Sequence, residues 1–337
     1  MDKSRIKIYS LGCRLNALEA EKIRAMLDAA GMADAVVINT CAVTHEALRQ
    51  SRQQFRKILR ENPGLPIFAT GCGAAFRPDD FTGATVIGNK DKFNPAAYGL
   101  NAAANGSGKI TRFEKMQKKG FVQIGDGCDR NCTYCITRIL RGRAAHFPYG
   151  DILDAARALI DNGYKEIILT GVNIADWKTV DMTLRDLCQK LLADLPEMER
   201  LTLSSLDPAA DLEPIIELIS AEPRMTPQLH LSVQSGSDEI LCRMGRRHNA
   251  ERIRCLAALA AKATPKIKFS WDIICGFPGE SEKLFDKTVA LARELKPVKI
   301  HAFPFSARPG TIAATMPDQV SRARSKVRVA QLLSVLN

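Results

Sequence analysis

Short apolar runs alternate with segments of helical periodicity along the first part of the chain. Strands are predicted at residues 5–10, 36–40 and 66–70, and helices at residues 16–30 and 45–61. This alternation predicts parallel strands joined by crossover helices.

The same alternation resumes at Gly120. Six further strands are predicted, at residues 121–125, 166–171, 200–205, 228–234, 268–276 and 298–305. Each ends in or near Gly, Ser, Asp or Gln, and the carboxyl ends of parallel strands line the active site in such architectures. Ordinary turn chemistry explains any one of these residues, but six in succession favour a site.

The expected fold class is α/β, with an N-terminal parallel-sheet domain at residues 1–95 and an open six-unit (β/α) barrel at residues 120–316. Residues 96–119 combine Ala, Asn, Gly and Ser with a basic run, and we interpret them as a linker. Residues 317–337 carry Val and Leu among Arg and Lys, which predicts an amphipathic connecting helix.

Composition is ordinary for a globular protein of 337 residues, with 46% hydrophobic and 25% charged residues. The start lacks the apolar stretch of a signal peptide, and no apolar run reaches the roughly 18 residues of a membrane helix. A cytoplasmic protein with no membrane partner is therefore expected. The formal net charge of +11 favours contact with a polyanion, although a basic surface that only confers solubility fits as well.

Three of the ten cysteines form the sharpest motif. Cys128, Cys132 and Cys135 are spaced Cys-x3-Cys-x2-Cys directly after a predicted strand. Reduced thiols are expected, since a chain of this length needs no disulfide framework. Three thiolates on a 4Fe-4S cluster leave one iron open for chemistry, whereas structural zinc usually takes four ligands in two pairs. The spacing resembles that of the radical S-adenosylmethionine superfamily, with a zinc or ferredoxin-like site as the alternative.

A second set places one cysteine after each of the first three strands: Cys13, Cys41 and Cys72. The carboxyl ends of neighbouring parallel strands lie together, so these thiols can converge on a second cluster, again with three ligands. Each alone would be a small buried hydrophobe. The remaining cysteines have no partners at metal-ligand spacing and are interpreted as packing residues: Cys188, Cys242, Cys255 and Cys275.

Both sets together resemble the methylthiotransferase family, which pairs an auxiliary-cluster domain with a radical S-adenosylmethionine barrel. Further motifs of the family stand at the predicted strand ends, at residues 169–173, 203–208, 233–238, 272–280 and 301–311. The resemblance implies that Cys128, Cys132 and Cys135 hold the cluster that reduces S-adenosylmethionine to a deoxyadenosyl radical. This radical then removes hydrogen from carbon 2 of an adenine.

The resemblance further implies that the cluster on Cys13, Cys41 and Cys72 delivers the sulfur, and that a second S-adenosylmethionine supplies the methyl group. The residues expected to line the cofactor are Tyr134, Gly171, Val172, Asn173, Ser205, Gln234 and Gly276. Turn or core packing is the alternative role for each of them.

The first motif, from Gly12 to Glu19, is similar to the branch of the family that acts on threonylcarbamoyladenosine. The chain departs from the family pattern at Ile136-Thr137-Arg138, where a proline is lost, and at Ala144-Ala145-His146, where a basic continuation is lost. The family also carries a small C-terminal β-barrel thought to hold nucleic acid, and none follows before Asn337. The sequence does not decide whether such a domain is missing naturally or by truncation.

The resemblance implies transfer RNA as partner and a flavodoxin or ferredoxin as electron donor, and it leaves the sulfur donor open. Candidate phosphate contacts are Arg49, Arg52, Arg56, Lys57, Arg60, Arg112, Lys115, Lys118 and Lys119, with solvated charge as the alternative. Arg243, Arg246 and Arg247 could hold a carboxylate or phosphate, or form a solvated helix face. Two other functions stay open: methylthiolation of a ribosomal protein, and a non-catalytic iron-sulfur protein that binds RNA or senses redox state.

Overall fold

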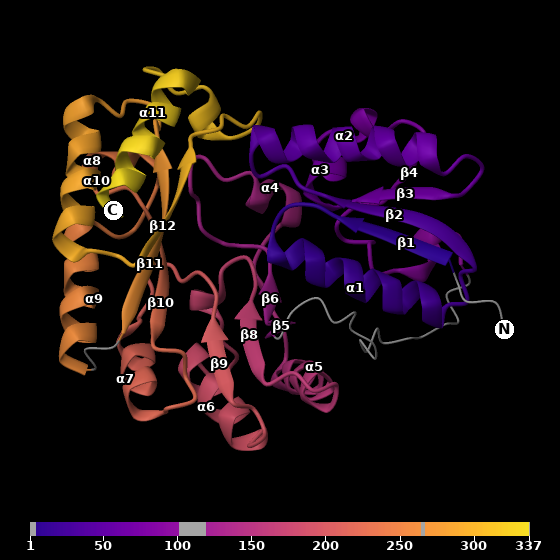
Figure 1. Cartoon of the computed structure of the whole chain (residues 1–337), viewed down its shortest axis with the longest axis horizontal. Helices are drawn as coiled ribbons and strands as arrows, with labels where there is room; N and C mark the ends of the chain where they lie inside the picture. Colours follow the sequence, from indigo (N-terminus) through magenta and orange to yellow (C-terminus); the bar gives the residue numbers. More distant parts are fainter. Residues whose placement is uncertain (1–4, 101–118, 264–266, 337) are drawn as a thin grey trace.

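A computed structural model describes residues 5–100, 119–263 and 267–336 of the chain (Figure 1). Most of the predicted linker, residues 101–118, lies outside the described residues. The predicted α/β class is confirmed, with a parallel sheet in the N-terminal part and an open barrel after it.

The N-terminal sheet has four parallel strands in sequence order: β1 (Arg5–Ser10), β2 (Asp34–Thr40), β3 (Ile67–Thr70) and β4 (Thr85–Val86). Helix α1 (Arg14–Ala29) packs on one face and α2 (His45–Glu61) on the other, with α3 (Gly71–Phe76) following β3. Successive β2 residues point to opposite faces of the sheet. Ala35 and Val37 pack in the core beneath α1, and Val36 and Ile38 pack in the core beneath α2.

The barrel consists of two parallel three-stranded sheets. One contains β5 (Lys119–Gln123), β8 (Glu166–Thr170) and β9 (Arg200–Leu203), and the other β10 (Gln228–Gln234), β11 (Lys268–Cys275) and β12 (Lys299–Pro304). A parallel bridge between Leu206 and Leu231 joins the two sheets. All six predicted strands are therefore present. The surrounding helices are α5 (Tyr149–Asp161), α6 (Leu184–Asp194), α7 (Glu213–Ala221), α8 (Asp238–Arg243), α9 (Ala250–Ala263), α10 (Glu282–Leu295) and α11 (Arg322–Leu333).

Several short elements complete the chain. Strands β6 (Gly125–Asp126) and β7 (Ala145–His146) form an antiparallel pair that encloses α4 (Thr137–Arg141). Single turns of 3-10 helix lie at Pro78–Phe81, Pro95–Tyr98, Ile174–Asp176, Ile312–Ala314 and Ser334–Leu336. None of the described helices is both long and apolar enough to cross a membrane.

Strand β10 shows how the barrel separates core from lumen. Leu229, Leu231 and Val233 are fully buried in the core shared with the outer helices. The alternate residues Gln228 and His230 instead line a cavity inside the barrel. The lumen is therefore polar and available for a ligand, while the core lies outside it.

The N-terminal unit closes one side of the open barrel. The Lys22 ammonium of α1 donates to Gln123 Oε1 of β5 at 3.0 Å, and the Asn89 amide donates to the Leu140 carbonyl of α4 at 3.0 Å. Figure 1 shows α4 between the N-terminal sheet and the barrel. The predicted site therefore lies where the two units meet.

Candidate functional site

The thiols of Cys13, Cys41 and Cys72, here called the N-terminal triad, all line one cavity of about 840 Å³. Cys13 is the N-cap of α1 after β1, Cys41 follows β2, and Cys72 lies in the first turn of α3 after β3. Burial raises the pKa of Cys41 to about 11, with the neighbouring Cys13 and Cys72 acting in the same direction. The fold thus gathers three thiols that the sequence separates widely.

Gly12 permits the close approach of two of these loops. Its φ is +101°, and a Cβ there would lie 2.4 Å from Cβ and 2.6 Å from Sγ of Cys41. The buried Asn16 amide donates to the Leu11 and Thr40 carbonyls at 2.8 and 3.0 Å, which joins the loops after β1 and β2. The spacing within the N-terminal triad is therefore set by backbone contacts.

The barrel triad, Cys128, Cys132 and Cys135, lies on the loop between β6 and α4. The Cys128 amide donates to the Gly142 carbonyl at 3.1 Å, and the Thr133 amide donates to the Met244 carbonyl at 3.0 Å. The Cys135 amide donates to the Cys132 carbonyl at 3.1 Å. The loop is thus held at both ends, with its three half-buried thiols on one turn of chain.

Two nitrogen donors point at sulfur atoms of the barrel triad. The Arg130 amide donates to Cys128 Sγ at 3.3 Å, and the Arg246 guanidinium donates to Cys132 Sγ at 3.4 Å. Burial raises the pKa of Cys128, and the charges of Cys135 and Cys132 act in the same direction. A cation or cluster bound among these sulfurs would relieve that repulsion, so the donor set suits a metal cluster.

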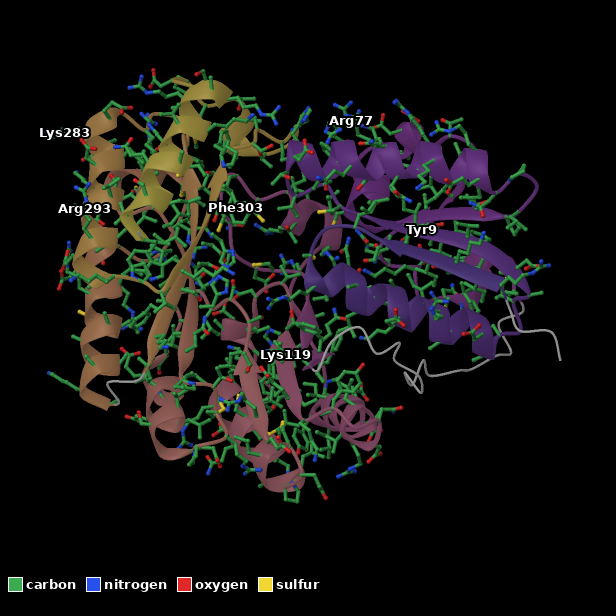
Figure 2. All side chains as sticks on the ribbon, viewed as in Figure 1. Tyr9, Arg77, Lys119, Lys283, Arg293 and Phe303 are labelled. Carbon is green, nitrogen blue, oxygen red and sulfur yellow. The ribbon has the colours of Figure 1, made fainter. Side chains whose placement is uncertain are left out.

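A second cavity of about 300 Å³ adjoins the first. It is lined by Cys135 and by two predicted cofactor residues, Tyr134 and Gln234. The two cavities share four lining residues: Val43, Thr137, Asp272 and Phe303. We call the contiguous space the joined cavity; Figure 2 labels Phe303 on the side of β12 that faces the N-terminal unit. The whole N-terminal triad and Cys135 of the barrel triad contribute to its wall.

The other predicted cofactor residues divide into two groups. Gly171, Val172 and Ser205 line the larger part of the joined cavity. Asn173 lies in a separate small pocket, where its amide donates to Asp176 Oδ2 at 2.8 Å. Gly276 donates its N–H to Glu280 Oε2 at 2.6 Å and packs against Ser325 of α11.

Gln234 has a backbone φ of +69° at the end of β10, where the register with β11 shifts. Non-glycine residues rarely adopt this left-handed conformation, and such strain is concentrated at functional sites. The strain lies beside the cavity that holds Cys135.

A hydrogen-bonded group inside the lumen was not found from the sequence. His230 Nε2 lies 3.0 Å from Asp272 Oδ1, and the Ser205 hydroxyl donates to Asp272 Oδ2 at 3.1 Å. The His230 and His301 rings stack with centroids 5.2 Å apart. Strand periodicity places these residues on the lumen face, but only the pairing of β10, β11 and β12 brings them together.

Arg141 is a second residue whose contacts the sequence did not reveal. Its guanidinium donates to Glu19 Oε1 at 2.7 Å, Asp126 Oδ1 at 3.0 Å and Asn16 Oδ1 at 3.1 Å, with 2% of its side chain exposed. Lys92 also pairs with Glu19, at 2.6 Å. Burial alone would raise the pKa of Glu19, but the hydrogen bonds and charges of Arg141 and Lys92 lower it. The network joins α1 to the barrel beside the N-terminal triad.

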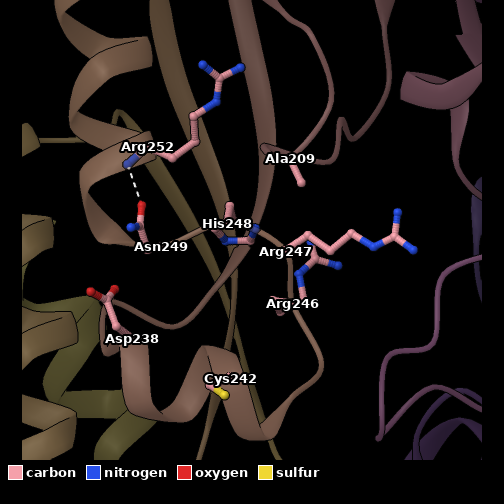
Figure 3. Close-up of a pocket in the computed structure, with 8 residues that line it drawn as sticks. All are labelled: Ala209, Asp238, Cys242, Arg246, Arg247, His248, Asn249 and Arg252. Atoms are coloured by element: carbon pink, nitrogen blue, oxygen red, sulfur yellow. Dashed lines mark hydrogen bonds between the residues drawn. The ribbon is translucent and has the colours of Figure 1, made fainter.

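Two of the three predicted arginines after β10, Arg246 and Arg247, line a surface pocket of about 440 Å³ (Figure 3). Arg246 is not a solvated residue, because 6% of its side chain is exposed and it pairs with Asp207 at 2.9 Å. Arg243 donates to the Pro278 carbonyl at 3.1 Å, and Arg247 lines the pocket. Of the three, Arg246 connects the pocket to the barrel triad.

Other sequence predictions met different outcomes. On α2, Arg49 and Lys57 pair with acidic residues of the same helix, and Arg52 pairs with Asp80 of the 3-10 turn. Lys119 pairs with Glu166. Arg112, Lys115 and Lys118 lie outside the described residues. Cys188 and Cys275 are buried in the core as predicted, but the packing role was wrong for Cys242 and Cys255, which are exposed because they lie on outward faces of α8 and α9.

Within the described residues, no three His, Cys, Asp or Glu side chains converge closely enough to hold a single metal ion. The N-terminal triad and Cys135 of the barrel triad instead border cavities, and this arrangement suits an iron-sulfur cluster, which is larger than one ion.

Known families match both parts of the chain. Residues 122–292 match the radical SAM superfamily, and residues 5–87 match uncharacterized protein family UPF0004. A relative from Rickettsia prowazekii, named threonylcarbamoyladenosine tRNA methylthiotransferase MtaB, is 35% identical over 96% of this chain and 82% of its own length. A relative of the same name from Chlamydia pneumoniae is 33% identical over 94% of this chain and 78% of its own length.

A relative from Zymomonas mobilis, named tRNA-2-methylthio-N(6)-dimethylallyladenosine synthase, is 32% identical over 98% of this chain and 81% of its own length. Among solved structures, the radical S-adenosylmethionine methyltransferase TsrM from Kitasatospora setae matches with a TM-score of 0.67 at 14% identity. That match covers 93% of this chain and 77% of TsrM, and it supports the fold.

Proposed function

Because the chain belongs to the radical S-adenosylmethionine methylthiotransferase family, and is therefore a radical S-adenosylmethionine enzyme, we propose that it methylthiolates transfer RNA. The proposed target is carbon 2 of N6-threonylcarbamoyladenosine. The observation that carries the proposal is the joined cavity, whose wall contains all three thiols of the N-terminal triad and Cys135 of the barrel triad.

In this proposal the barrel triad holds a 4Fe-4S cluster and the N-terminal triad holds an auxiliary 4Fe-4S cluster. When bound, the clusters and S-adenosylmethionine supply the radical, the sulfur and the methyl group. Tyr134, Gln234, Gly171, Val172 and Ser205 line the joined cavity and would contact the cofactor. Asn173 directly follows Val172 in sequence, and Gly276 directly follows β11.

The protein's own part in the reaction is to position and shield. Arg246 donates to a sulfur of the barrel triad, and its ion pair with Asp207 holds the guanidinium in place. The N-terminal unit covers the open side of the barrel, which keeps bulk water from the reacting atoms.

The substrate assignment rests on four relatives that carry the threonylcarbamoyladenosine name and on the Arg14 and Glu19 motif. Transfer RNA, an electron donor such as a flavodoxin or ferredoxin, and a cytoplasmic location belong to the same proposal. The immediate sulfur donor is left open.

Mass spectrometry of transfer RNA nucleosides tests the proposal. Cells that lack the protein should lose the 2-methylthio derivative of threonylcarbamoyladenosine, and the wild-type chain should restore it. Cys128→Ala and Cys41→Ala should each fail to restore this nucleoside. Each variant should contain about four irons per chain instead of about eight. Cys255→Ala is the matched control, because that thiol is exposed on α9. An undiminished nucleoside, or a methylthio increment on a ribosomal protein instead, would contradict the proposal.

A further inference from the structure

The joined cavity has a cationic wall that the chemistry of the two triads does not use. Lys299, His301 and Phe303 alternate along β12, and all three line the cavity because side chains two apart share a strand face. Arg14 reaches the same cavity from the first turn of α1, with its guanidinium 5.6 Å from the centre of the Phe121 ring. Lys119 and Arg141 also line the cavity, but both are held in ion pairs, so the N-terminal unit and the barrel each contribute one cation without such a pair.

Both cations act on His301, which lines the same cavity. Burial lowers the pKa of His301, and the positive charges of Lys299 and Arg14 lower it further, whereas Asp272 opposes them. A neutral His301 stacked on His230 offers a hydrogen bond without adding charge. The charge of this wall therefore comes from Arg14 and Lys299.

Neither cation is neutralised within the described part of the chain. Arg14 and Lys299 form no ion pair there, whereas Lys119, on the same cavity, pairs with Glu166 at 2.9 Å. Asp272 also lines the cavity, but His230 and Ser205 already engage its two oxygens. The negative charge of Asp272 offsets one of the two cations, so Arg14, Lys299 and Asp272 together leave a net positive charge, which favours an anionic ligand.

We propose that Arg14 and Lys299 bind the carboxylate of an amino-acid substituent on N6 of the target adenosine. The inference rests on the proposed function and explains how the enzyme would select one modified adenosine over another. A threonylcarbamoyl group ends in a carboxylate, whereas a dimethylallyl group is apolar. An arginine binds a carboxylate through two parallel hydrogen bonds, and a lysine adds a point charge. A cavity of about 840 Å³ is large enough for a modified nucleoside.

The position of Arg14 gives the contact a second role. Arg14 directly follows Cys13 of the N-terminal triad, so a carboxylate bound there ties the substrate to the unit that carries the auxiliary site. Lys299 approaches from the opposite edge of the open barrel. The N-terminal unit and the barrel would therefore both contact the substituent.

The test compares two RNA stem-loops that differ only in charge. One carries N6-threonylcarbamoyladenosine and the other carries its carboxamide, in which the carboxylate is replaced by a neutral group of the same size. The anaerobically reconstituted enzyme with both clusters is assayed for methylthio product on each, as kcat/KM. Arg14→Gln and Lys299→Gln remove one charge each, and Arg14→Lys keeps the charge.

Matched controls lie on the outer helix α10. Arg293→Gln and Lys283→Gln remove the same charges from exposed positions far from the cavity (Figure 2). Iron content is measured for every variant, because Arg14 neighbours a proposed cluster ligand. If Arg14→Gln loses iron, the conclusion rests on Lys299→Gln alone. Lys299 lies on a barrel strand and is distant in sequence from all six thiols.

The kcat/KM of the wild-type enzyme is expected to be about tenfold or more higher on the carboxylate RNA than on the carboxamide RNA. This ratio matches the usual contribution of hydrogen bonds to a charged group. The preference should fall to about twofold in Arg14→Gln and in Lys299→Gln, and it should persist in Arg14→Lys and both controls. Equal use of both RNAs by the wild type, or an unchanged preference in the variants, overturns the inference and leaves the proposed function intact. Deoxyadenosine release without methylthio product on either RNA overturns both.

Discussion

At the scale of single residues, Gly12 sets the distance between two thiols of the N-terminal triad. A methyl group there would lie 2.4 Å from Cβ of Cys41, closer than side-chain carbons approach. We predict that Gly12→Ala displaces Cys41 and lowers the iron content from about eight to about four per chain. Gly31→Ala is the control, because Gly31 also has a positive φ, +76°, but nothing lies within 4 Å of its added Cβ. Full iron content in Gly12→Ala would refute the prediction.

His248 makes a pH-dependent contribution to stability. Burial lowers its pKa to about 4, and Arg246 acts in the same direction. The unfolded chain, with a histidine pKa of about 6.5, binds the proton more readily than the folded chain. Stability is therefore retained above pH 6.5 and lost as the pH falls towards 4, by up to about 1.4 kcal/mol per pH unit.

We predict that His248→Gln removes this slope in denaturant unfolding measured between pH 5 and 8. His45→Gln, at an exposed position, should leave the slope in place. An identical slope in wild type and His248→Gln would show that the histidine is not its source.

The six triad cysteines could be picked out at this scale because their type and spacing already point to a cluster. Arg141 and Arg246 could not. As letters in a sequence, they look like solvated charge, and only the fold buries them against Glu19 and Asp207. The placement of Asn173 was equally hidden, since its pairing with Asp176 is made by a local turn.

At the scale of elements, a buried arginine adds to the apolar packing that attaches helix α11 to the barrel. Arg328 pairs with Glu280 at 2.9 Å and with Glu282, and 4% of its side chain is exposed. Burial raises the pKa of Glu280 to about 7, against the opposing effects of the Gly276 amide and Arg328. The ion pair is therefore what allows a charged Glu280 beside the strand end of β11.

We predict that Arg328→Ala destabilises the fold by about 3 kcal/mol, because it leaves a buried carboxylate unpaired. Since a protonated Glu280 avoids that cost, the loss should be larger at pH 8 than at pH 6. Arg324→Ala, which removes an exposed partner of Glu282, should cost less than about 1 kcal/mol. Thermal unfolding at the two pH values measures both, and equal losses for the two variants would contradict the prediction.

The strands and long helices could be predicted because their apolar periodicity is strong over six or more residues. Helix α2 spans His45–Glu61 as predicted, and β10 spans Gln228–Gln234 as predicted. The β6–β7 pair was missed because two residues per strand carry no period. Cys242 and Cys255 were misplaced because α8 and α9 are short or alanine-rich, so their inward faces were ambiguous.

At the scale of the whole molecule, the sequence indicated two units but not how they are joined. The junction is a buried polar network around Arg141, which crosses from α4 of the barrel to Glu19 and Asn16 of α1. Such contacts between residues more than 100 positions apart leave no local signal. The joined cavity, and with it the proximity of the two triads, depends on this junction.

We predict that Arg141→Gln loosens the junction without unfolding either sheet. Glu19 would keep Lys92 but lose its partner from the barrel, while Asp126 would lose Arg141 altogether. Breaking a buried pair costs about 3 kcal/mol, so amide hydrogens of α1 should exchange about 100-fold faster. Arg138→Gln on the same helix is the control, because Arg138 forms no ion pair among the described residues. If α1 exchanges at the wild-type rate in Arg141→Gln, the two units are held together by their apolar contacts, and the arginine network serves only the N-terminal triad.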